Sequence, residues 1–221
     1  MCGFAGFVGE VENREQVLEN MIDTIIHRGP DSSGKFVDED AALGFRRLSI
    51  IDLSESGDQP LYNEDRSKVL VFNGEIYNYQ ELREELIQAG HTFVSNTDSE
   101  TLIHGYEQWG EELVYRLRGM YAFAIWDQKA KRLFSARDIF GIKPLYYAQM
   151  NGTLMFGSEI KSFLEHPKFD KVFNEDALGN YLSFQFVPTN ETFFKGVFCV
   201  QPGHYFVYEN GKMTIKRYFE P

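Results

Sequence analysis

The second residue of the chain is a cysteine. If Cys2 became the first residue, its side chain could act as a nucleophile and its α-amino group as a base. Methionine followed by a small side chain is the usual substrate for N-terminal processing, which would remove Met1 and leave Cys2 with a free α-amino group. The unperturbed pKa of such an amine is about 7.7–8.0 and that of a thiol about 8.5, so one residue would supply nucleophile and base near neutral pH. Gly3 and Gly6 would let a substrate approach closely. The alternative is an ordinary buried cysteine, since a lone Cys most often packs as a small hydrophobe.

A thiolate that attacks a carboxamide needs hydrogen-bond donors for the oxyanion that develops on the carbonyl oxygen. Asn73 and Gly74 directly follow a predicted strand, Val69 to Phe72, and the Asn73 amide and the Gly74 N–H could point together at one oxygen. The sequence supports a second interpretation equally well. Asn-Gly is a common two-residue hairpin turn, and the residues after it could begin another strand.

An amino-acid substrate also presents a carboxylate and an ammonium group. Arg47 could grip the carboxylate through two hydrogen bonds, although Arg46 beside it carries the same charge. Because neighbours in a strand face opposite sides, only one of the two arginines would reach a given site. Asp98 could pair with the ammonium group, but in isolation the simpler interpretation of Asp98 is that it caps a helix.

Other chemistries find less support in the sequence. No glycine-rich loop of the GxxxxGK[ST] kind is present, so no ATP site is predicted here. The FGS segment at Phe156 to Ser158 lacks the GxSxG pattern of serine hydrolases, and Cys199 is interpreted as a core residue. The histidines show no zinc-like spacing, so we expect no metal site. They are His27, His91, His104, His166 and His204.

Composition limits the class of protein and its partners. The 221 residues are 43% hydrophobic and carry a formal net charge of −11, which argues against nucleic acid or an anionic membrane surface as a partner. No stretch approaches the roughly 20 apolar residues of a membrane span, and no secretory signal is visible. The two cysteines fit a reducing compartment, so a cytoplasmic protein is expected.

The elements that must position these residues are short and mixed. Helices are predicted from Arg14 to His27, Asn78 to Ala89, Asp98 to about Trp109, Ser158 to Glu165 and Glu175 to Phe184. Strands are predicted from Cys2 to Val8, Ala42 to Leu53, Lys68 to Ile76, Met120 to Asp127, Arg132 to Ala136, Pro144 to Gln149 and Thr153 to Gly157, with a hairpin from His204 to Tyr218. Strands do not alternate strictly with helices, which favours an α+β fold with antiparallel sheets.

Two local signals refine these boundaries. Asn78 followed by Glu81 predicts a capping box at the start of one helix. Residues 27–34 (HRGPDSSG) have the composition of a loop.

A series of segments then identifies a family. They are MCGFAGFVG, HRGPD, RLSIIDLS followed by QPL, FNGEIYNY, TDSETL, LRGMYAFAIWD, RDIFGIKPLYY and FGSEIKSFL. Together they cover nearly the whole chain in one order, and they resemble the N-terminal glutaminase domain of glutamine-hydrolysing asparagine synthetase, a class II glutamine amidotransferase. Related amidotransferases share the CG start but are not similar in the IFGIKPLYY stretch.

The resemblance implies a four-layer αββα sandwich of two antiparallel sheets between helices, as in N-terminal nucleophile hydrolases, with Cys2 at the end of a central strand. It implies that Asn73 and Gly74 form the oxyanion hole and that Arg47 holds the α-carboxylate of the substrate. The remaining substrate contacts would be Glu75 and Asp98 at the α-amino end and the backbone around Ile50 and Ile51 at the carboxamide.

The same resemblance implies an activity. Residues 1–221 would form one domain that hydrolyses the side-chain amide of L-glutamine through a γ-glutamyl thioester on Cys2, supplying ammonia for ATP-dependent asparagine synthesis. We expect no cofactor in this domain, with ATP and magnesium needed only by a separate synthetase domain or subunit that accepts the ammonia. The chain ends where that domain would begin, so an excised domain is favoured over a free-standing glutaminase, and a homodimer is considered. The alternatives are an amidase for another amide and a non-catalytic regulatory module.

Overall fold

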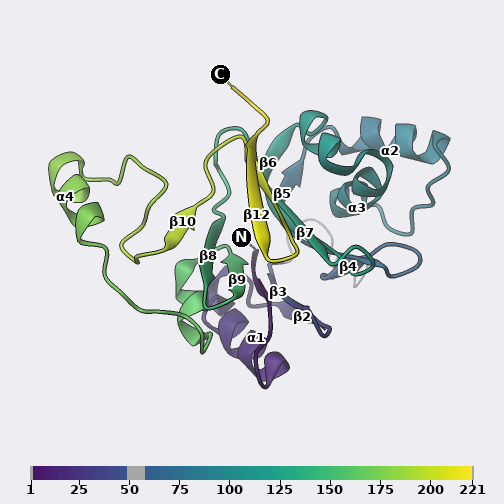
Figure 1. The fold of residues 1–221 in the computed structure, drawn as a ribbon. Helices are drawn as coiled ribbons and strands as arrows, with labels where there is room; N and C mark the ends of the chain where they lie inside the picture. The colour runs from purple at the N-terminus through teal and green to yellow at the C-terminus, as the bar shows by residue number, and fades with distance from the viewer. Residues whose placement is uncertain (1, 49–57, 221) are drawn as a thin grey trace.

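The computed structural model describes residues 2–48 and 58–220, in which two six-stranded sheets pack face to face (Figure 1). Every strand pair within them is antiparallel. The strand order of sheet A is β10 (Val197–Cys199), β8 (Tyr146–Met150), β9 (Thr153–Gly157), β1 (Gly3–Val8), β3 (Ala41–Arg47) and β2 (Ser32–Val37). The strand order of sheet B is β12 (Lys212–Arg217), β11 (His204–Glu209), β7 (Arg132–Arg137), β6 (Gly119–Asp127), β5 (Lys68–Ile76) and β4 (Leu61–Tyr62).

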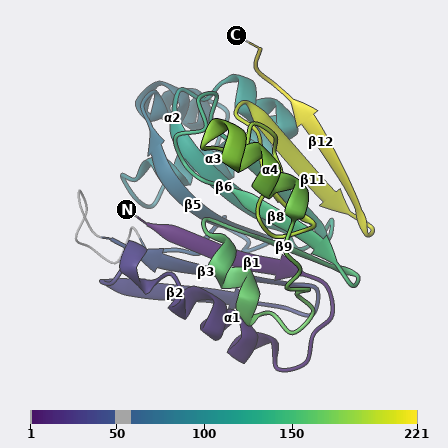
Figure 2. The ribbon, with the colours of Figure 1, turned by 90° about the vertical axis from the view of Figure 1, so that its left-hand side faces the viewer.

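Helices cover the two outer faces and complete four layers. Helix α1 (Arg14–Asp23) packs on sheet A, whereas α3 (Asp98–Trp109) packs on sheet B with α2 (Tyr79–Gln88) beside it. Helix α4 (Glu175–Phe184) stands away from both sheets, at the far left in Figure 1 and in front in Figure 2. Short 3-10 helices are η1 (Ile26–Arg28), η3 (Gly110–Tyr115) and η4 (Ile160–Glu165). The predicted αββα sandwich is confirmed.

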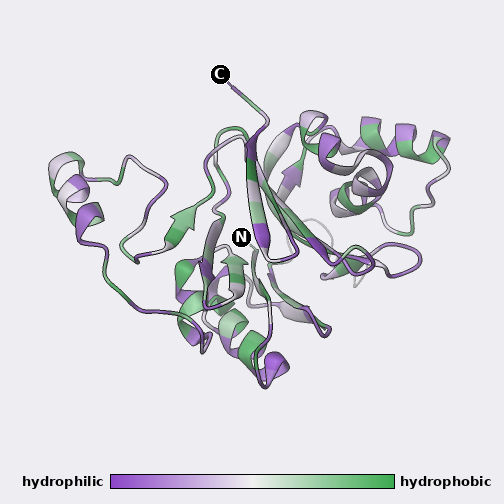
Figure 3. Ribbon diagram, in the orientation of Figure 1, coloured by the Kyte–Doolittle hydropathy of each residue, from purple (hydrophilic) through white to green (hydrophobic). Residues whose placement is uncertain are grey.

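Strand alternation explains why both faces of each sheet are apolar. In β1, Phe4 and Val8 enter the core between the sheets, whereas Phe7 points outward to α1. In β5, Val71 points inward while Phe72 packs toward α3. Each fully buried side chain of this size contributes roughly 1.5–3 kcal/mol, so helix layers and sheets stabilise one another. The helices need only one apolar face, and Figure 3 shows apolar and polar residues alternating along α1 and α2.

Several predicted boundaries shift in the structure. The first helix ends at Asp23 and gives way to η1, and β2 begins at Ser32, inside the segment predicted as a loop. The predicted strand from Ala42 is β3, which ends at Arg47; Leu48 is no longer in the strand, and residues 49–53 of that prediction lie outside the described residues. The predicted helix from Ser158 is the 3-10 helix η4.

The predicted capping box is wrong. Asn78 does precede α2, but its side chain makes no capping hydrogen bond. Its amide instead donates to the carbonyl of Arg116 at 2.9 Å and accepts from the N–H of Arg118 at 2.9 Å. The tertiary partners therefore prevail over the local one.

None of the helices in the described ranges is long and apolar enough to span a membrane.

The central strand β1 leaves no room for a side chain at Gly6. A Cβ there would lie 2.6 Å from the backbone oxygen of Ala42 and 2.5 Å from Cζ of Phe156. We predict that Gly6→Ala lowers the free energy of unfolding by about 1–3 kcal/mol, measured by urea denaturation, because overpacking displaces neighbouring strands. Gly179→Ala in α4 is the control, since no atom lies within 4 Å of its Cβ position. The control should leave stability unchanged or raise it by up to about 1 kcal/mol. Equal stability of Gly6→Ala and wild type would contradict this packing.

Candidate active site

Cys2 lies immediately before β1, at the edge of the core between the sheets. It is half-buried and packs against the apolar cluster that fills this core. Its Sγ accepts the backbone N–H of Leu48 at 3.4 Å and lies 3.6 Å from the carbonyl oxygen of the same residue. Cys2 is therefore next to the end of β3 that carries Arg47, as the pairing of Gly3 with Arg46 requires.

Two sequence motifs hold the backbone around Cys2. Arg28, from the HRGPD segment, donates through Nε to the carbonyl of Cys2 at 3.0 Å and through Nη1 to Glu159 at 3.0 Å. Ser158, from the FGSEI segment, donates its N–H to Phe4 O at 2.9 Å and accepts Phe4 N–H on its hydroxyl at 3.1 Å. The start of β1 is thus fixed on both sides.

Glu159 is kept ionised in this arrangement. Burial raises the pKa of its carboxyl, but hydrogen bonds from Arg28, His27 and Lys161 outweigh burial and hold that pKa below its usual range. The His27 ring nitrogen lies 2.9 Å from Glu159 and the Lys161 ammonium lies 3.2 Å from it. A charged Glu159 in turn orients Arg28 toward the Cys2 carbonyl.

Asn73 faces the same core from the opposite sheet. It is two residues beyond Val71, which enters the core between the sheets, and it is 2% exposed. Its cross-strand neighbour is the small Ala122. The Nδ2 amide of Asn73 is buried and has no hydrogen-bond partner among the described residues. An unsatisfied buried donor costs about 1–3 kcal/mol and marks a place where a ligand acceptor would be favourable.

The structure decides between the two interpretations of Asn73-Gly74. Strand β5 continues through Ile76 and pairs with β6 at both residues, so the hairpin-turn interpretation is wrong. Gly74 pairs with Tyr121, and a Cβ at Gly74 would lie 2.2 Å from the carbonyl oxygen of Met120. Only glycine allows β5 to pass this close to β6.

Arg47 and Arg46 face opposite sides of β3, as predicted. Arg46 turns outward, donating to the carbonyl of Ile22 at 3.2 Å and pairing with Asp23. Arg47 is buried, and its Nη1 donates to the carboxylate of Asp58 at 2.7 Å. The guanidinium selected by the sequence is therefore the one that faces the inner core.

The segment that begins at Asp58 connects the two sheets close to Arg47. The Gln59 side chain accepts the N–H of Phe72 at 2.6 Å and donates to its carbonyl at 3.2 Å. The carbonyl of Gln59 lies directly over Gly34 of β2, where a Cβ would be 2.0 Å away. Gly34 pairs with Phe45, which pairs with Phe4. Gln59 thereby connects Phe72, the residue before Asn73, to the edge strand β2 of sheet A.

Two carboxylates lie beyond Asn73. The Asp98 carboxylate accepts the N–H of Ile76 at 2.8 Å, and Thr97 rather than Asp98 is the cap of α3. Burial raises the pKa of Asp98, the Ile76 hydrogen bond opposes this, and the charge of nearby Glu75 adds to the increase. Glu75 itself is exposed. Two acidic groups that interact at this point form an environment suited to a cation.

The remaining predicted positions, Ile50 and Ile51, lie outside the described residues, as does Met1. Sequence reasoning assigned no role to several residues that the structure places around Cys2 and Asn73. They are Arg28, Asp58, Gln59, Ser158 and Glu159. The signal was present, because the segments HRGPD, QPL and FGSEI carry or adjoin these residues.

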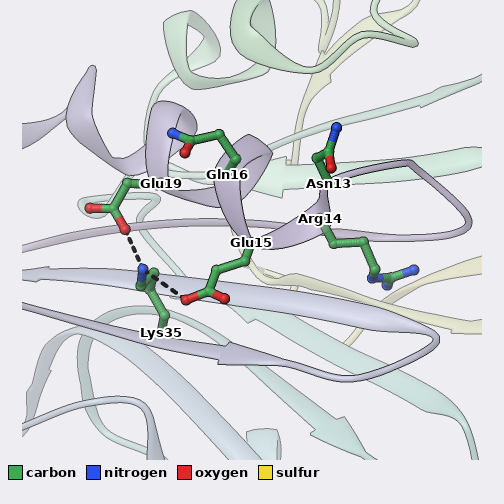
Figure 4. A pocket seen from close by; sticks show the side chains of 6 residues that line it. All are labelled: Asn13, Arg14, Glu15, Gln16, Glu19 and Lys35. Atoms are coloured by element: carbon green, nitrogen blue, oxygen red, sulfur yellow. Dashed lines mark hydrogen bonds and ion pairs between the residues drawn. The ribbon is translucent and has the colours of Figure 1, made fainter.

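A polar depression between α1 and β2 is unrelated to this site (Figure 4). None of the predicted site residues lines it. Its Lys35 ammonium lies 3.3 Å from Glu15 and also pairs with Glu19, and the hydrogen bond with Glu19 raises the pKa of Lys35. The ammonium of Lys35 is therefore already compensated.

Comparison with known proteins gives consistent results. A family model described as a glutamine amidotransferase domain matches residues 1–219. The chain is 46% identical to a glutamine-hydrolysing asparagine synthetase of Bacillus subtilis, covering 100% of this chain and 35% of that protein. It is 38% identical to amidase chyE of Penicillium rubens, in a match that covers 94% of this chain and 32% of that protein. The chain thus spans about a third of the length of these relatives.

The fold has solved counterparts. The structure of glutamine phosphoribosylpyrophosphate amidotransferase from B. subtilis superposes with a TM-score of 0.73 at 21% identity, covering 100% of this chain and 50% of that one.

The raised pKa of Asp98 has a consequence for stability. Because the unfolded chain releases this proton more readily than the folded one, ionisation of Asp98 favours the unfolded state. We predict that Asp98→Asn, which keeps an acceptor for Ile76, raises the free energy of unfolding at pH 7. Below the unfolded pKa of about 3.9 the carboxyl is protonated in both states, so the advantage should disappear. Urea denaturation of the variant and the wild type at pH 7 and at a pH below about 3.9 tests this prediction. An equal or lower stability of the variant at pH 7 would contradict it.

Proposed function

Because the chain belongs to the glutamine amidotransferase family, we propose that it hydrolyses the side-chain amide of L-glutamine to glutamate and ammonia. The observation that carries the proposal is that three residues face the same region of the molecule. Cys2, Arg47 and Asn73 come from three strands or strand ends, and all three face the core between the sheets. A thiol, a cation that binds a carboxylate and an amide donor left open by the described part of the chain are what attack on an amino-acid carboxamide requires.

The proposed reaction has two halves and begins after removal of Met1. The free α-amine of Cys2 takes the thiol proton, directly or through a water, and Sγ bonds to the side-chain carbonyl carbon of glutamine. Asn73 Nδ2 and the Gly74 N–H stabilise the oxyanion. The tetrahedral intermediate then collapses, the C–N bond breaks, and nitrogen leaves as ammonia with the proton held by the amine. Water attacks the γ-glutamyl thioester and releases glutamate, which restores the thiol.

Charge complementarity supports the choice of substrate. The guanidinium of Arg47 already holds a carboxylate, that of Asp58, at 2.7 Å, so its orientation suits an α-carboxylate that displaces Asp58. Asp98 and Glu75 lie beyond Asn73, where the α-ammonium group of the same substrate would compensate their charge. The backbone around Ile50 and Ile51 would hold the carboxamide.

The relatives support a proposal for the fate of the ammonia. We propose that it is delivered to an ATP- and magnesium-dependent synthetase part that makes asparagine, since the relative from B. subtilis is named for that activity and this chain covers 35% of it. In this proposal the glutaminase half uses neither ATP nor a metal. Both cysteines are free, which fits a reducing, cytoplasmic setting.

One relative supports a second candidate, hydrolysis of an amide other than glutamine. Amidase chyE is 38% identical over most of this chain. The two candidates differ in the use of Arg47 and Asp98, because a substrate without an amino-acid head group leaves both without a substrate contact. Arg47→Ala should therefore abolish glutamine hydrolysis but spare hydrolysis of a simple primary amide, if that is the true reaction.

The function is tested by ammonia release from L-glutamine by the purified chain, with its intact mass recorded. We predict that the mass shows loss of Met1, that glutamate and ammonia form in equal amounts, and that Cys2→Ala abolishes both. Cys199→Ala is the matched control and should retain the rate, since Cys199 lies in β10 and accepts from Arg137 at 3.0 Å. Turnover by Cys2→Ala at the wild-type rate would overturn the proposal.

The oxyanion assignment has its own test. We predict that Asn73→Ala lowers kcat by about 10²–10³, because one oxyanion donor is lost, and leaves KM nearly unchanged. Thermal stability should be maintained, since the Asn73 amide has no hydrogen-bond partner among the described residues. Steady-state kinetics and a melting curve measure both. A near-normal kcat would show that Asn73 is not an oxyanion donor.

A further inference from the structure

A cluster of metal-binding side chains lies beside α3, apart from the residues around Cys2. His104 and Glu107 come from α3, His91 from the segment between α2 and α3, and Glu64 from the turn between β4 and β5. One ligand atom of each lies within 4.8 Å of the other three. Figure 1 shows β4 and α3 as neighbours on one side of the sandwich. We propose that these four side chains bind a divalent transition-metal ion of the zinc class.

The distances within the cluster suit this ion. Nδ1 of His104 lies 3.2 Å from Oε2 of Glu107 and 3.7 Å from Oε1 of Glu64. Nδ1 of His91 lies 3.9 Å from the same oxygen of Glu107. Tetrahedral ligands at bond lengths of about 2.0–2.2 Å are about 3.4 Å apart, so small side-chain rotations would close the site.

The donor set indicates which class of metal is bound. Two imidazole nitrogens and two carboxylates are characteristic of zinc and similar transition metals. Calcium and magnesium prefer oxygen ligands alone, and a pair of histidines would be unusual for either. Zinc is therefore the probe of choice, with cobalt as its spectroscopic substitute.

A buried histidine supplies an independent observation. His104 is 2% exposed, and its Nε2 is buried without a hydrogen-bond partner among the described residues. Behind it, Oε1 of Glu100 lies 3.6 Å from Nε2, while Nδ1 points at Glu107 and Glu64. A carboxylate behind the ring orients a metal-binding histidine and raises its basicity. A slight movement that shortens this contact would complete that arrangement.

Two carboxylates beside His104, the supporting Glu100 and the proposed ligand Glu107, are themselves held in place. Glu100 is 1% exposed and accepts from the N–H of Val94 at 2.7 Å and from both the N–H and the hydroxyl of Ser95 at 2.7 and 2.6 Å. Glu107 accepts from Nδ2 of Asn63 at 2.7 Å. These contacts fix the two acids before any metal arrives.

The charge of the cluster also favours a cation. Three carboxylates act on His104, namely Glu64, Glu100 and Glu107. A divalent ion at this place would compensate two of these carboxylate charges.

The metal would act as a structural tie, independent of the proposed amide hydrolysis. It would link the β4–β5 turn, the segment before α3 and the middle of α3, the helix that begins at Asp98. A metal that binds the folded chain but not the unfolded one raises the free energy of unfolding. The increase grows with the logarithm of the ratio of metal concentration to Kd.

The test titrates Zn²⁺ into the chelator-treated full chain by calorimetry and records melting curves. Cys2→Ala serves as the parent protein, so that no thiol is present to chelate the metal together with the N-terminal amine. We expect one Zn²⁺ per chain, a melting temperature that rises with Zn²⁺, and a visible tetrahedral absorption band with Co²⁺. Glu64→Gln and His91→Asn should each weaken binding at least about tenfold. Both positions are at least partly exposed, so these variants should fold. The control, His204→Asn, removes a partly exposed histidine outside the cluster and should bind as the parent does.

Two results would overturn the proposal. One is the absence of saturable Zn²⁺ binding to a folded parent protein. The other is binding that Glu64→Gln and His91→Asn leave unchanged, which would place the metal elsewhere. Glutaminase activity does not enter either readout, so failure of the metal site is distinguishable from failure of the proposed reaction.

Discussion

The packing of sheet A on sheet B is the constraint on which the rest of the structure depends. Side chains alternate along each strand, so once Phe4 and Val71 point into the core between the sheets, the positions two residues away point there too. Cys2 and Asn73 are those positions. A slip of one residue in either strand would turn the thiol or the amide to an outer, helix-covered face.

This arrangement concentrates groups whose burial is unfavourable. The Asn73 amide is buried and has no hydrogen-bond partner in residues 2–48 and 58–220, and burial raises the pKa of Asp98. Arg47 is buried but compensated by Asp58. Such strain persists only because the surrounding apolar layers stabilise the fold, and an amino acid carrying a carboxamide would relieve it by supplying an acceptor and an ammonium group. The site is thus electrostatically prepared for its proposed substrate.

Much of the fold could be predicted from the sequence, because most strands have strong local patterns. Strand β5 matches its predicted range, and the Asn210-Gly211 hairpin is confirmed by positive φ at both residues. Asn73-Gly74 could not be decided locally, since β6, the strand that pairs with it, lies more than forty residues later in the chain. The Asn78 capping box failed for a similar reason, because distant carbonyl and N–H groups engage its side chain.

The candidate site shows the same division. The opposite facing of Arg46 and Arg47 follows from strand geometry alone, and the structure agrees. The contact of Arg28 with the Cys2 carbonyl and the two-sheet contact of Gln59 depend on how segments meet in space. Spacing also gave no reason to pair His91 with His104, whose ring centroids lie 5.2 Å apart in the fold.

Covalent labelling tests the central claim, that Cys2 becomes the N-terminal residue and attacks an amino-acid carboxamide, most directly. The full chain is incubated with a diazoketone analogue of L-glutamine and its intact and peptide masses are measured. The account predicts a chain without Met1 that carries one analogue on Cys2, with labelling slowed by excess glutamine and by Arg47→Ala. A folded chain that loses Met1 but remains unlabelled, or that is labelled on Cys199, would contradict it.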